Sequence, residues 1–390
     1  MKNASLLLAT ILMTSILVGP VSLAATDFSV VFNFDGTHGS EPIEEVLVED
    51  KDGNMWGTTV GGGAWGYGTI FKLAPDGTMA TVYSFDAQTF PVGGLVLGVD
   101  GNFYGVGAGG GVVYRLTPTG DYTVLHFFEG EDGSGPGDLI QAQDGSFYGT
   151  TSSGGSKSGG TIFKISPAGT FTKLYDFDPV QSYQQRSLIQ STDGRFYGIA
   201  LVGGGSKACK DGCGTVFRFN PTGKLTVIHE FAATDGSGPV SLMQGKDGRF
   251  YGTTYEGGDL TRCLSYNVRV GCVTVFRINA KGTHFKTLRM FENSSGEYPD
   301  GPLIEGPDGR FYGVCVSGNR RRSSGNVYSV GPSGGLRILH FFSGPDGTEP
   351  EGGLLLHSNG KFYGTTQEGG TGGAGGVVFS LDVGFASSAN

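Results

Sequence analysis

A short pattern of apolar and polar positions recurs seven times along the chain. Each copy reads Leu, four residues, Asp-Gly or Asn-Gly, one residue, an apolar residue, an aromatic residue and Gly, as in 139–149. The aromatic positions are Trp56, Tyr104, Tyr148, Tyr197, Tyr251, Tyr312 and Tyr363, with successive spacings of 48, 44, 49, 54, 61 and 51 residues. A recurrence of this length indicates a repeat architecture.

Each repeat contains four short segments that we expect to be extended. In the third repeat they are roughly 138–143, 147–151, 161–166 and 170–177, all rich in β-branched and aromatic residues and bounded by turn residues. Beyond the N-terminal apolar run, no stretch shows sustained helical periodicity. The sequence therefore predicts an all-β protein.

The connections between these segments fall into two groups. From the Leu to the turn Asp or Asn is five residues, and from there to the aromatic residue is four, in all seven copies. Asp-Gly between two strands predicts a hairpin with a type I′ turn. A Pro-x-Gly turn joins the third and fourth segments in five copies, whereas the second-to-third connection varies from 9 to 24 residues. One end of each four-stranded sheet is thus constant, and the opposite end varies.

Seven sheets of about 50 residues each favour a seven-bladed β-propeller of four-stranded antiparallel blades. A linear β-solenoid is the alternative, although its rungs are usually shorter and more uniform. The chain begins with a lone fourth-type strand, 28–34, and stops after a third-type strand, 376–381. We expect strand 28–34 to complete the last blade and close the ring, which removes a free sheet edge. Residues 25–384 would form one domain, followed by a short tail, 385–390.

The first 24 residues have the composition of a secretory signal peptide. Lys2 precedes an apolar run, Leu6–Val18, and Ser22-Leu23-Ala24 supplies the small residues of a cleavage site. No second apolar run follows, so we expect a secreted, soluble monomer without a membrane span. The net charge of −9 disfavours nucleic acid as a partner.

Three motifs carry a family resemblance. Asp-Gly-Ser-Phe-Tyr-Gly-Thr-Thr (144–151), 159–169 and 122–133 resemble the GloVer-type tandem repeat of exported bacterial proteins, the "choice-of-anchor" group. The resemblance covers essentially the whole chain after the signal peptide. It implies an exported protein with no established catalytic activity. Such proteins often carry a C-terminal anchoring segment, which the end of this sequence does not resemble.

An exported protein can oxidise its cysteines. We expect Cys209 to pair with Cys213 and Cys263 with Cys272, as local staples in two loops. Cys315 is then the odd cysteine outside both pairs. A metal site is the alternative, but Cys-x3-Cys has no companion His nearby.

Two acidic sets are candidate metal ligands. The turn residues Asp52, Asp100, Asp144, Asp193, Asp247, Asp308 and Asn359 are better explained by hairpin geometry. The connections into the variable end contain Asp35, Asp132, Asp235 and Asp346, which could converge on the axis and bind Ca²⁺. Simple turn formation is favoured for these too, so no cofactor is predicted. The histidines do not cluster, and His126, His229 and His340 occupy one packing column.

The sharpest asymmetry lies in three adjacent repeats, whose long variable loops are basic. We predict binding residues there, namely Lys207, Lys210, Arg262, Tyr266, Arg269, Arg320, Arg321 and Arg322. Loops on a rigid scaffold commonly carry function, although drifted, solvated loops are the plainer interpretation. The predicted function is a non-catalytic binding or structural module, whose variable end contacts a glycan, the cell envelope or a protein. The basic loops imply an anionic ligand. The alternative is a propeller hydrolase or lyase acting on an extracellular polymer or lactone.

Overall fold

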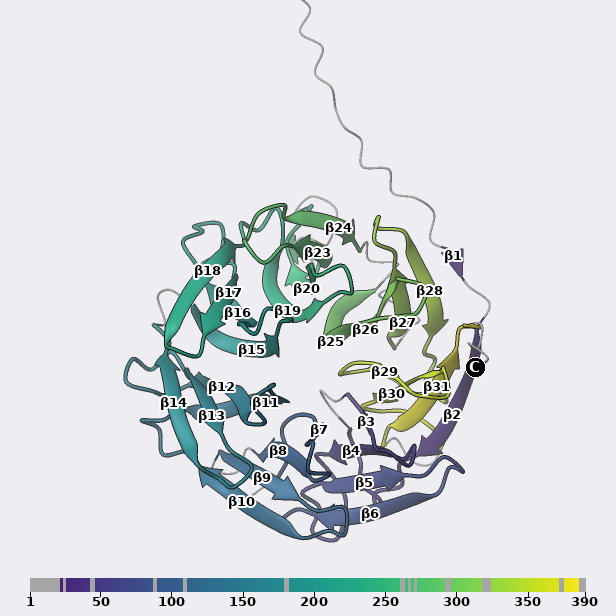
Figure 1. Ribbon diagram of the computed structural model, residues 1–390. Coiled ribbons are helices and arrows are strands. Elements are labelled where there is room, and N and C mark those ends of the chain that lie inside the picture. Colours follow the sequence, from purple (N-terminus) through teal and green to yellow (C-terminus); the bar gives the residue numbers. More distant parts are fainter. Residues whose placement is uncertain are drawn as a thin grey trace, which may run out of the picture.

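The chain forms a ring of seven four-stranded antiparallel blades around a central axis (Figure 1). The computed structural model describes residues 22–23, 26–42, 46–86, 90–107, 111–178, 182–259, 264–265, 268–269, 272–291, 296–317, 324–371 and 375–385. All the regular elements in these ranges are strands, as predicted. The β-propeller is confirmed.

Blades 1 to 7 follow the chain, and the four strands of each blade run from the axis outward. The innermost strands are β3 (Val48–Glu49), β7 (Val96–Leu97), β11 (Ser134–Gln141), β15 (Ser182–Gln190), β19 (Ser237–Gln244), β25 (Glu297–Glu305) and β29 (Leu355–Leu356). The second strands are β4 (Met55–Thr59), β8 (Phe103–Gly107), β12 (Phe147–Ser153), β16 (Phe196–Gly203), β20 (Phe250–Glu256), β26 (Phe311–Ser317) and β30 (Phe362–Thr366).

The third strands are β5 (Thr69–Leu73), β9 (Val112–Leu116), β13 (Thr161–Ile165), β17 (Thr215–Asn220), β23 (Thr274–Ile278), β27 (Asn326–Val330) and β31 (Val377–Asp382). The outer strands are β6 (Met79–Ser84), β10 (Tyr122–Phe127), β14 (Phe171–Asp176), β18 (Lys224–Glu230), β24 (Lys286–Met290), β28 (Leu336–Phe341) and, in blade 7, β2 (Asp27–Asn33). Strand β1 (Ser22–Leu23) pairs in parallel with β28.

The ring closes as expected. Strand β2 pairs antiparallel with β31, from Asp27 opposite Asp382 to Asn33 opposite Val377, so a strand near the start of the described residues is the outer strand of the last blade. It begins one residue earlier than predicted. In the third blade, the innermost strand also begins earlier than predicted, because Ser134 and Pro136 pair with the extension of β12.

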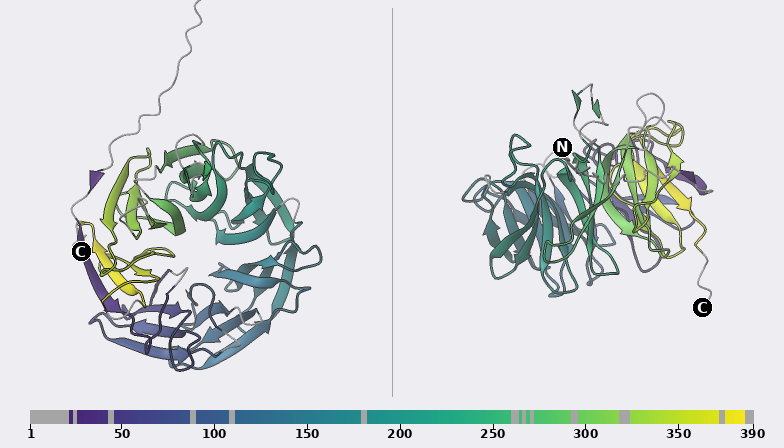
Figure 2. Two further views of the ribbon diagram at one scale, coloured as in Figure 1. Left: turned by 180° about the vertical axis from the view of Figure 1, so that it is seen from behind. Right: turned by 90° about the horizontal axis from the view of Figure 1, so that it is seen from above.

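Antiparallel pairing places two kinds of connection at opposite ends of the ring. We call the end with the turns between first and second strands, and between third and fourth strands, the turn end. The opposite end, with the second-to-third connections and the crossings between blades, is the loop end. Figure 2 shows the short green hairpin of β21 (Leu264–Ser265) and β22 (Val268–Arg269) standing out from one face.

The turns after the first strands differ from the predicted type I′. In blade 2, the N–H of Gly101 donates to the carbonyl oxygen of Gly98, and only Gly101 has a positive φ, of 80°. No turn Asp or Asn is among the described non-glycine residues with positive φ. The turn is thus a three-residue loop that ends in a left-handed glycine. The carboxylate of Asp100 accepts the N–H of Asn102, which explains the Asp without a left-handed backbone.

Pairs of aromatic rings in close contact join the blades. The aromatic residue of each second strand lies against the second-strand Phe of the next blade, with ring centroids 3.9–4.4 Å apart in Trp56–Phe103, Tyr104–Phe147, Tyr148–Phe196, Tyr197–Phe250, Tyr251–Phe311 and Tyr312–Phe362. Between blades 7 and 1, Met55 takes the place of the Phe and shares a buried cluster with Tyr363. Successive side chains of a strand point to opposite faces, so the Phe and the following aromatic residue of one second strand contact the two neighbouring blades.

The glycine that ends the motif makes room for the third strand. A Cβ on Gly149 would lie 2.6 Å from the ring of Phe163, and one on Gly252 would lie 2.5 Å from Phe276. The close backbone approach requires a residue without a side chain.

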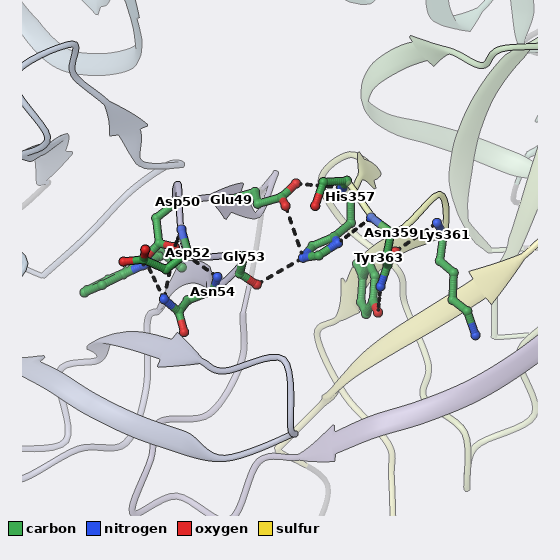
Figure 3. A network of polar contacts seen from close by, with 11 residues as sticks. Glu49, Asp50, Asp52, Gly53, Asn54, His357, Asn359, Lys361 and Tyr363 are labelled. Carbon is green, nitrogen blue, oxygen red and sulfur yellow. Dashed lines mark hydrogen bonds and ion pairs between the residues drawn. The ribbon is translucent and has the colours of Figure 1, made fainter. Parts of the chain in front are cut away.

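Polar contacts reinforce the seam between blades 7 and 1 at the turn end (Figure 3). The buried His357 accepts the N–H of Asn359 at Nδ1, and its Nε2 lies 3.1 Å from the carbonyl oxygen of Gly53 and 3.4 Å from Glu49. Glu49 also accepts the N–H of Ser358. Residues more than 300 positions apart in sequence are thus held together where the ring closes.

Candidate functional site on the loop end

The turn end is occupied by structural hydrogen bonds. In five blades the buried Tyr hydroxyl donates to the turn Asp at 2.7–3.1 Å, in Tyr104–Asp100, Tyr148–Asp144, Tyr197–Asp193, Tyr251–Asp247 and Tyr312–Asp308. In blade 7, Asn359 donates to Tyr363, and in blade 1 the indole N–H of Trp56 donates to Asp50 instead of Asp52. The sevenfold motif is therefore a scaffold device.

These hydrogen bonds shift the pKa values of the turn carboxylate and of the tyrosine that donates to it. Burial disfavours the charged carboxylate of Asp100, but hydrogen bonds from Tyr104 and Asn102 outweigh it and lower the pKa of Asp100. Burial, followed by the contact with Asp100, raises the pKa of Tyr104. The carboxylate of Asp100 is consequently ionised at neutral pH, and its oxygens already accept hydrogen bonds from Asn102 and Tyr104.

Neighbouring blades are also tied together at the turn end. The side chains of Gln141, Gln190 and Gln244 accept N–H groups from the turn of the preceding blade at 2.8–3.0 Å. Glu305 and Glu49 do the same for their neighbours. Between blades 6 and 7 the corresponding residues are Pro307, which has no N–H, and Leu356, which has no acceptor. Because Pro307 offers no backbone N–H, the absence of an acceptor at Leu356 leaves no donor without a partner.

The loop end shows an alternation that the sequence analysis missed. Odd-numbered blades carry Thr-Thr directly after the motif glycine, followed within three residues by Gly-Gly, whereas even-numbered blades lack the Thr-Thr. The four Thr-Thr pairs are 58–59, 150–151, 253–254 and 365–366. Comparing the repeats two blades apart, instead of one, would have revealed it.

The Ca²⁺ candidates lie in the crossings into the odd blades, and each is engaged locally. Asp132, Asp235 and Asp346 lie 2.7, 3.2 and 2.8 Å from the outer-strand histidines His126, His229 and His340. Each carboxylate also accepts a backbone N–H, at 2.8 Å. Among the described residues, no three His, Cys, Asp or Glu side chains gather in a way that could hold a metal.

The histidine column is a packing column, as the sequence suggested. His126, His229 and His340 stack on Phe171, Phe285 and Phe28 of the next blade, at centroid distances of 3.6–4.0 Å.

Asp35 is not equivalent to the other three candidates. Gly36 and Gly39 exchange the hydrogen bonds that Gly130 and Gly133, and Gly344 and Gly347, exchange elsewhere. This alignment places His38, rather than Asp35, in the column of Asp132. Asp35 instead accepts the backbone N–H of His38 and lies 3.2 Å from its ring nitrogen Nδ1.

The predicted binding loop of blade 4 is closed by a disulfide and held against blade 5. Cys209 and Cys213 form a disulfide, and the carbonyl oxygen of Cys213 accepts the N–H of Gly238 in blade 5 at 2.9 Å. The Cys209 sulfur lies 3.4 Å from the hydroxyl of Ser237, also in blade 5. This frame presents Lys207 and Lys210 as exposed side chains. The exposed Asp211 in the same loop partly offsets their charge.

The remaining predicted site residues are only partly placed. Arg262, Cys263, Tyr266 and Arg320, Arg321 and Arg322 lie outside the described residues. Arg269 belongs to β22, of which only the backbone is described. Cys272 is buried and disulfide-bonded, and Cys315 is a fully buried thiol. Blades 4, 5 and 6, which carry these loops, are consecutive in the ring (Figure 1).

Two exposed aromatic residues on the same end escaped the sequence analysis. Trp65 is 70 % exposed and Tyr67 is 44 % exposed, in the loop 61–68 of blade 1. The available signal was the rarity of tryptophan, since the chain has two.

A family model, the Gloeobacter/Verrucomicrobia repeat, matches the chain over residues 90–266 and again over 212–388. No curated protein sequence matches the chain.

Several solved structures share the fold at low sequence identity. A streptogramin B lyase is 13 % identical, with a TM-score of 0.61 over 92 % of this chain and 97 % of that one. An inactive virginiamycin B lyase from Staphylococcus aureus, with quinupristin, is 12 % identical, with a TM-score of 0.62 over 92 % and 99 %. The extracellular domain of a hybrid two-component system from B. thetaiotaomicron is 12 % identical, with a TM-score of 0.58 over 92 % and 41 %. At such identities the likeness shows the fold alone.

Proposed function

The chain belongs to the Gloeobacter/Verrucomicrobia repeat family, and on that premise we propose that it is an exported, non-catalytic module that binds an acidic extracellular glycan through its loop end. The stapled loop of blade 4 carries the proposal. Its disulfide and its bonds to blade 5 fix the backbone that presents Lys207 and Lys210. A preformed loop loses little conformational entropy when it binds.

The difference between the two ends of the ring supports a binding site on the loop end. At the turn end, five part-buried Tyr–Asp hydrogen bonds and the seam at His357 use the polar groups for structure. The connections of variable length, the disulfide and the basic loops all lie at the loop end. Binding residues on loops held by a rigid scaffold are the common arrangement.

Export fits both the predicted signal peptide, residues 1–24, and the Cys209–Cys213 disulfide, because disulfides persist in oxidising compartments. N-terminal sequencing of the secreted protein tests it, with cleavage expected after Ala24 or Ala25. Within the described part of the chain, no helix is long and apolar enough to span a membrane. The alternative, a hydrolase or lyase, stays a prediction.

A glycan array tests the binding proposal. We expect wild type to bind acidic glycans, and the Lys207→Ser/Lys210→Ser variant to lose most of that binding. The Arg320→Ala/Arg321→Ala/Arg322→Ala variant extends the test to blade 6. Lys246→Ser/Lys281→Ser removes the same charge from exposed positions at the turn end and should leave the profile unchanged. Identical profiles for all four proteins would exclude the basic loops as the binding site.

A further inference from the structure

The loop 61–68 of blade 1 presents two aromatic side chains to solvent. Trp65 and Tyr67 are 70 % and 44 % exposed, whereas the other tryptophan, Trp56, is 1 % exposed and packed against Phe103 in the core. Among the described residues, neither Trp65 nor Tyr67 stacks on another ring or makes a side-chain hydrogen bond. Large aromatic rings with one polar atom are the side chains that most often anchor ligands.

The backbone beneath these rings is fixed. The N–H of Gly68 donates to the carbonyl oxygen of Gly62 at 3.1 Å, and the N–H of Gly63 donates to Gly36 at 2.9 Å. The N–H of Ala64 donates to the hydroxyl of Ser84 at 3.2 Å. The loop is therefore ordered before any ligand arrives, which lowers the entropic cost of binding.

Blade 3 builds the same frame without aromatic residues. The N–H of Gly160 donates to Gly154 at 3.0 Å, and the N–H of Gly155 donates to Gly130 at 2.7 Å. The N–H of Ser156 donates to Asp176 at 2.8 Å, as Ala64 does to Ser84.

The tips of the two loops have the same length but different side chains, and the blade 3 tip adds one hydrogen bond, from the N–H of Ser158 to the carbonyl oxygen of Gly155 at 3.1 Å. Ala-Trp-Gly-Tyr at 64–67 corresponds to Ser-Lys-Ser-Gly at 156–159. Even the left-handed position is shared, with a φ of 81° at Gly66 and 61° at Ser158. Folding of this loop does not require Trp65 or Tyr67, so their exposure needs another explanation.

We propose that Trp65 and Tyr67 form a binding site for a neutral saccharide. A pyranose ring has an apolar C–H face that packs flat on an aromatic ring, and hydroxyl groups that pair with the indole N–H and the phenol. Residues 61–68 contain no charged side chain, so the loop favours a neutral sugar. The site is separate from the lysines of blade 4, because two blades lie between them along the shorter arc of the ring (Figure 1).

Affinity electrophoresis tests the proposal with three neutral polysaccharides in the gel: laminarin, hydroxyethylcellulose and galactomannan. Wild type should be retarded by at least one, relative to a gel without polysaccharide. The variant Ala64→Ser/Trp65→Lys/Gly66→Ser/Tyr67→Gly, which copies the tip of blade 3, should bind at least about tenfold more weakly. Because blade 3 already holds this tetrapeptide on the same frame, the variant should fold with an unchanged thermal midpoint.

A matched control and a second measurement complete the design. Val99→Ser removes an apolar residue that is 89 % exposed at the turn end, and retardation should persist. In fluorescence, Trp65 should dominate acrylamide quenching, and the retarding polysaccharide should protect it.

Two results would overturn the proposal. One is equal migration of wild type and the blade 1 variant in all three gels. The other is self-association in sedimentation that requires Trp65 and occurs without retardation, since this would assign the rings to a protein contact. Loss of acidic-glycan binding in the Lys207/Lys210 variant leaves the result at Trp65 unchanged, so the two proposals can fail separately.

Discussion

The two ends of the ring use repetition differently. At the turn end, the same Tyr–Asp hydrogen bond occurs in five blades, and Gln or Glu side chains tie five of the turns to the blade that follows. At the loop end, blades 1 and 3 repeat a backbone frame but change the side chains at its tip. Side-chain contacts that repeat from blade to blade therefore belong to the scaffold. A backbone conformation that repeats while its exposed side chains change belongs to the candidate binding surface.

The largest expected effect of a single substitution lies in the scaffold motif. Gly252→Ala places a Cβ against the carbonyl oxygen of Ser241 and the ring of Phe276. Because a backbone atom cannot move aside, we expect a loss of about 3 kcal/mol in the free energy of unfolding, measured by urea denaturation. Gly335→Ala, where a Cβ meets nothing within 4 Å, is the control and should change little. Equal effects for both would show that steric packing is not the reason for the motif glycine.

The Tyr–Asp pair should contribute less than the packing. Tyr104→Phe removes the hydroxyl that donates to Asp100 at 2.7 Å. A hydrogen bond to a charged group contributes about 1.5–3 kcal/mol, and partial exposure of the turn favours the lower figure. Denaturation at pH 7 measures the effect. A variant as stable as wild type would assign the motif tyrosine to ring stacking alone.

The same pair predicts a dependence on pH. Hydrogen bonds keep the pKa of Asp100, Asp144, Asp193 and Asp247 below the usual value despite burial. Their contribution to stability is present above the unfolded value, about pH 3.9, and is lost as the pH falls through the folded pKa values. Tyr104→Phe should flatten this acid-side loss when unfolding is followed from pH 6 to pH 2. A steeper loss in the variant would contradict the assignment.

Removing the disulfide should have a smaller effect on the ring than on the loop. Cys209→Ser/Cys213→Ser opens a link with a sequence separation of four. For so short a loop the entropic contribution is at most about 2 kcal/mol. We expect a modest drop in the thermal midpoint and faster proteolysis within 203–214. Unchanged proteolysis would show that the bonds to blade 5 alone hold the loop.

The smallest effect on stability is expected at the proposed binding residues. Lys207→Ser/Lys210→Ser changes exposed side chains with no ion pair among the described residues. Its urea midpoint should match that of wild type, within about 0.5 kcal/mol. A larger loss would mean that these lysines stabilise the loop instead of serving a ligand.

The sequence predicted the fold because its spacing is regular. Five residues from Leu to the turn and four to the aromatic residue fix a hairpin register, and the opposite faces of one strand require two neighbours. The prediction failed where local signals are ambiguous. Asp-Gly fits both a type I′ turn and a three-residue loop, and Asp35-Gly36 has the same letters as Asp132-Gly133 in a different frame.

The sequence by itself determined the blade count, the constant hairpins and the closing strand, since these follow from periodicity and length. Tertiary structure alone decided which side chains are engaged and which are exposed. It stacked His126 on Phe171 of the next blade, joined Glu49 to Ser358 across the seam, and buried Trp56 against Phe103 while leaving Trp65 exposed. The physical reason is that burial and hydrogen bonding depend on neighbours supplied by other blades, which no local pattern encodes.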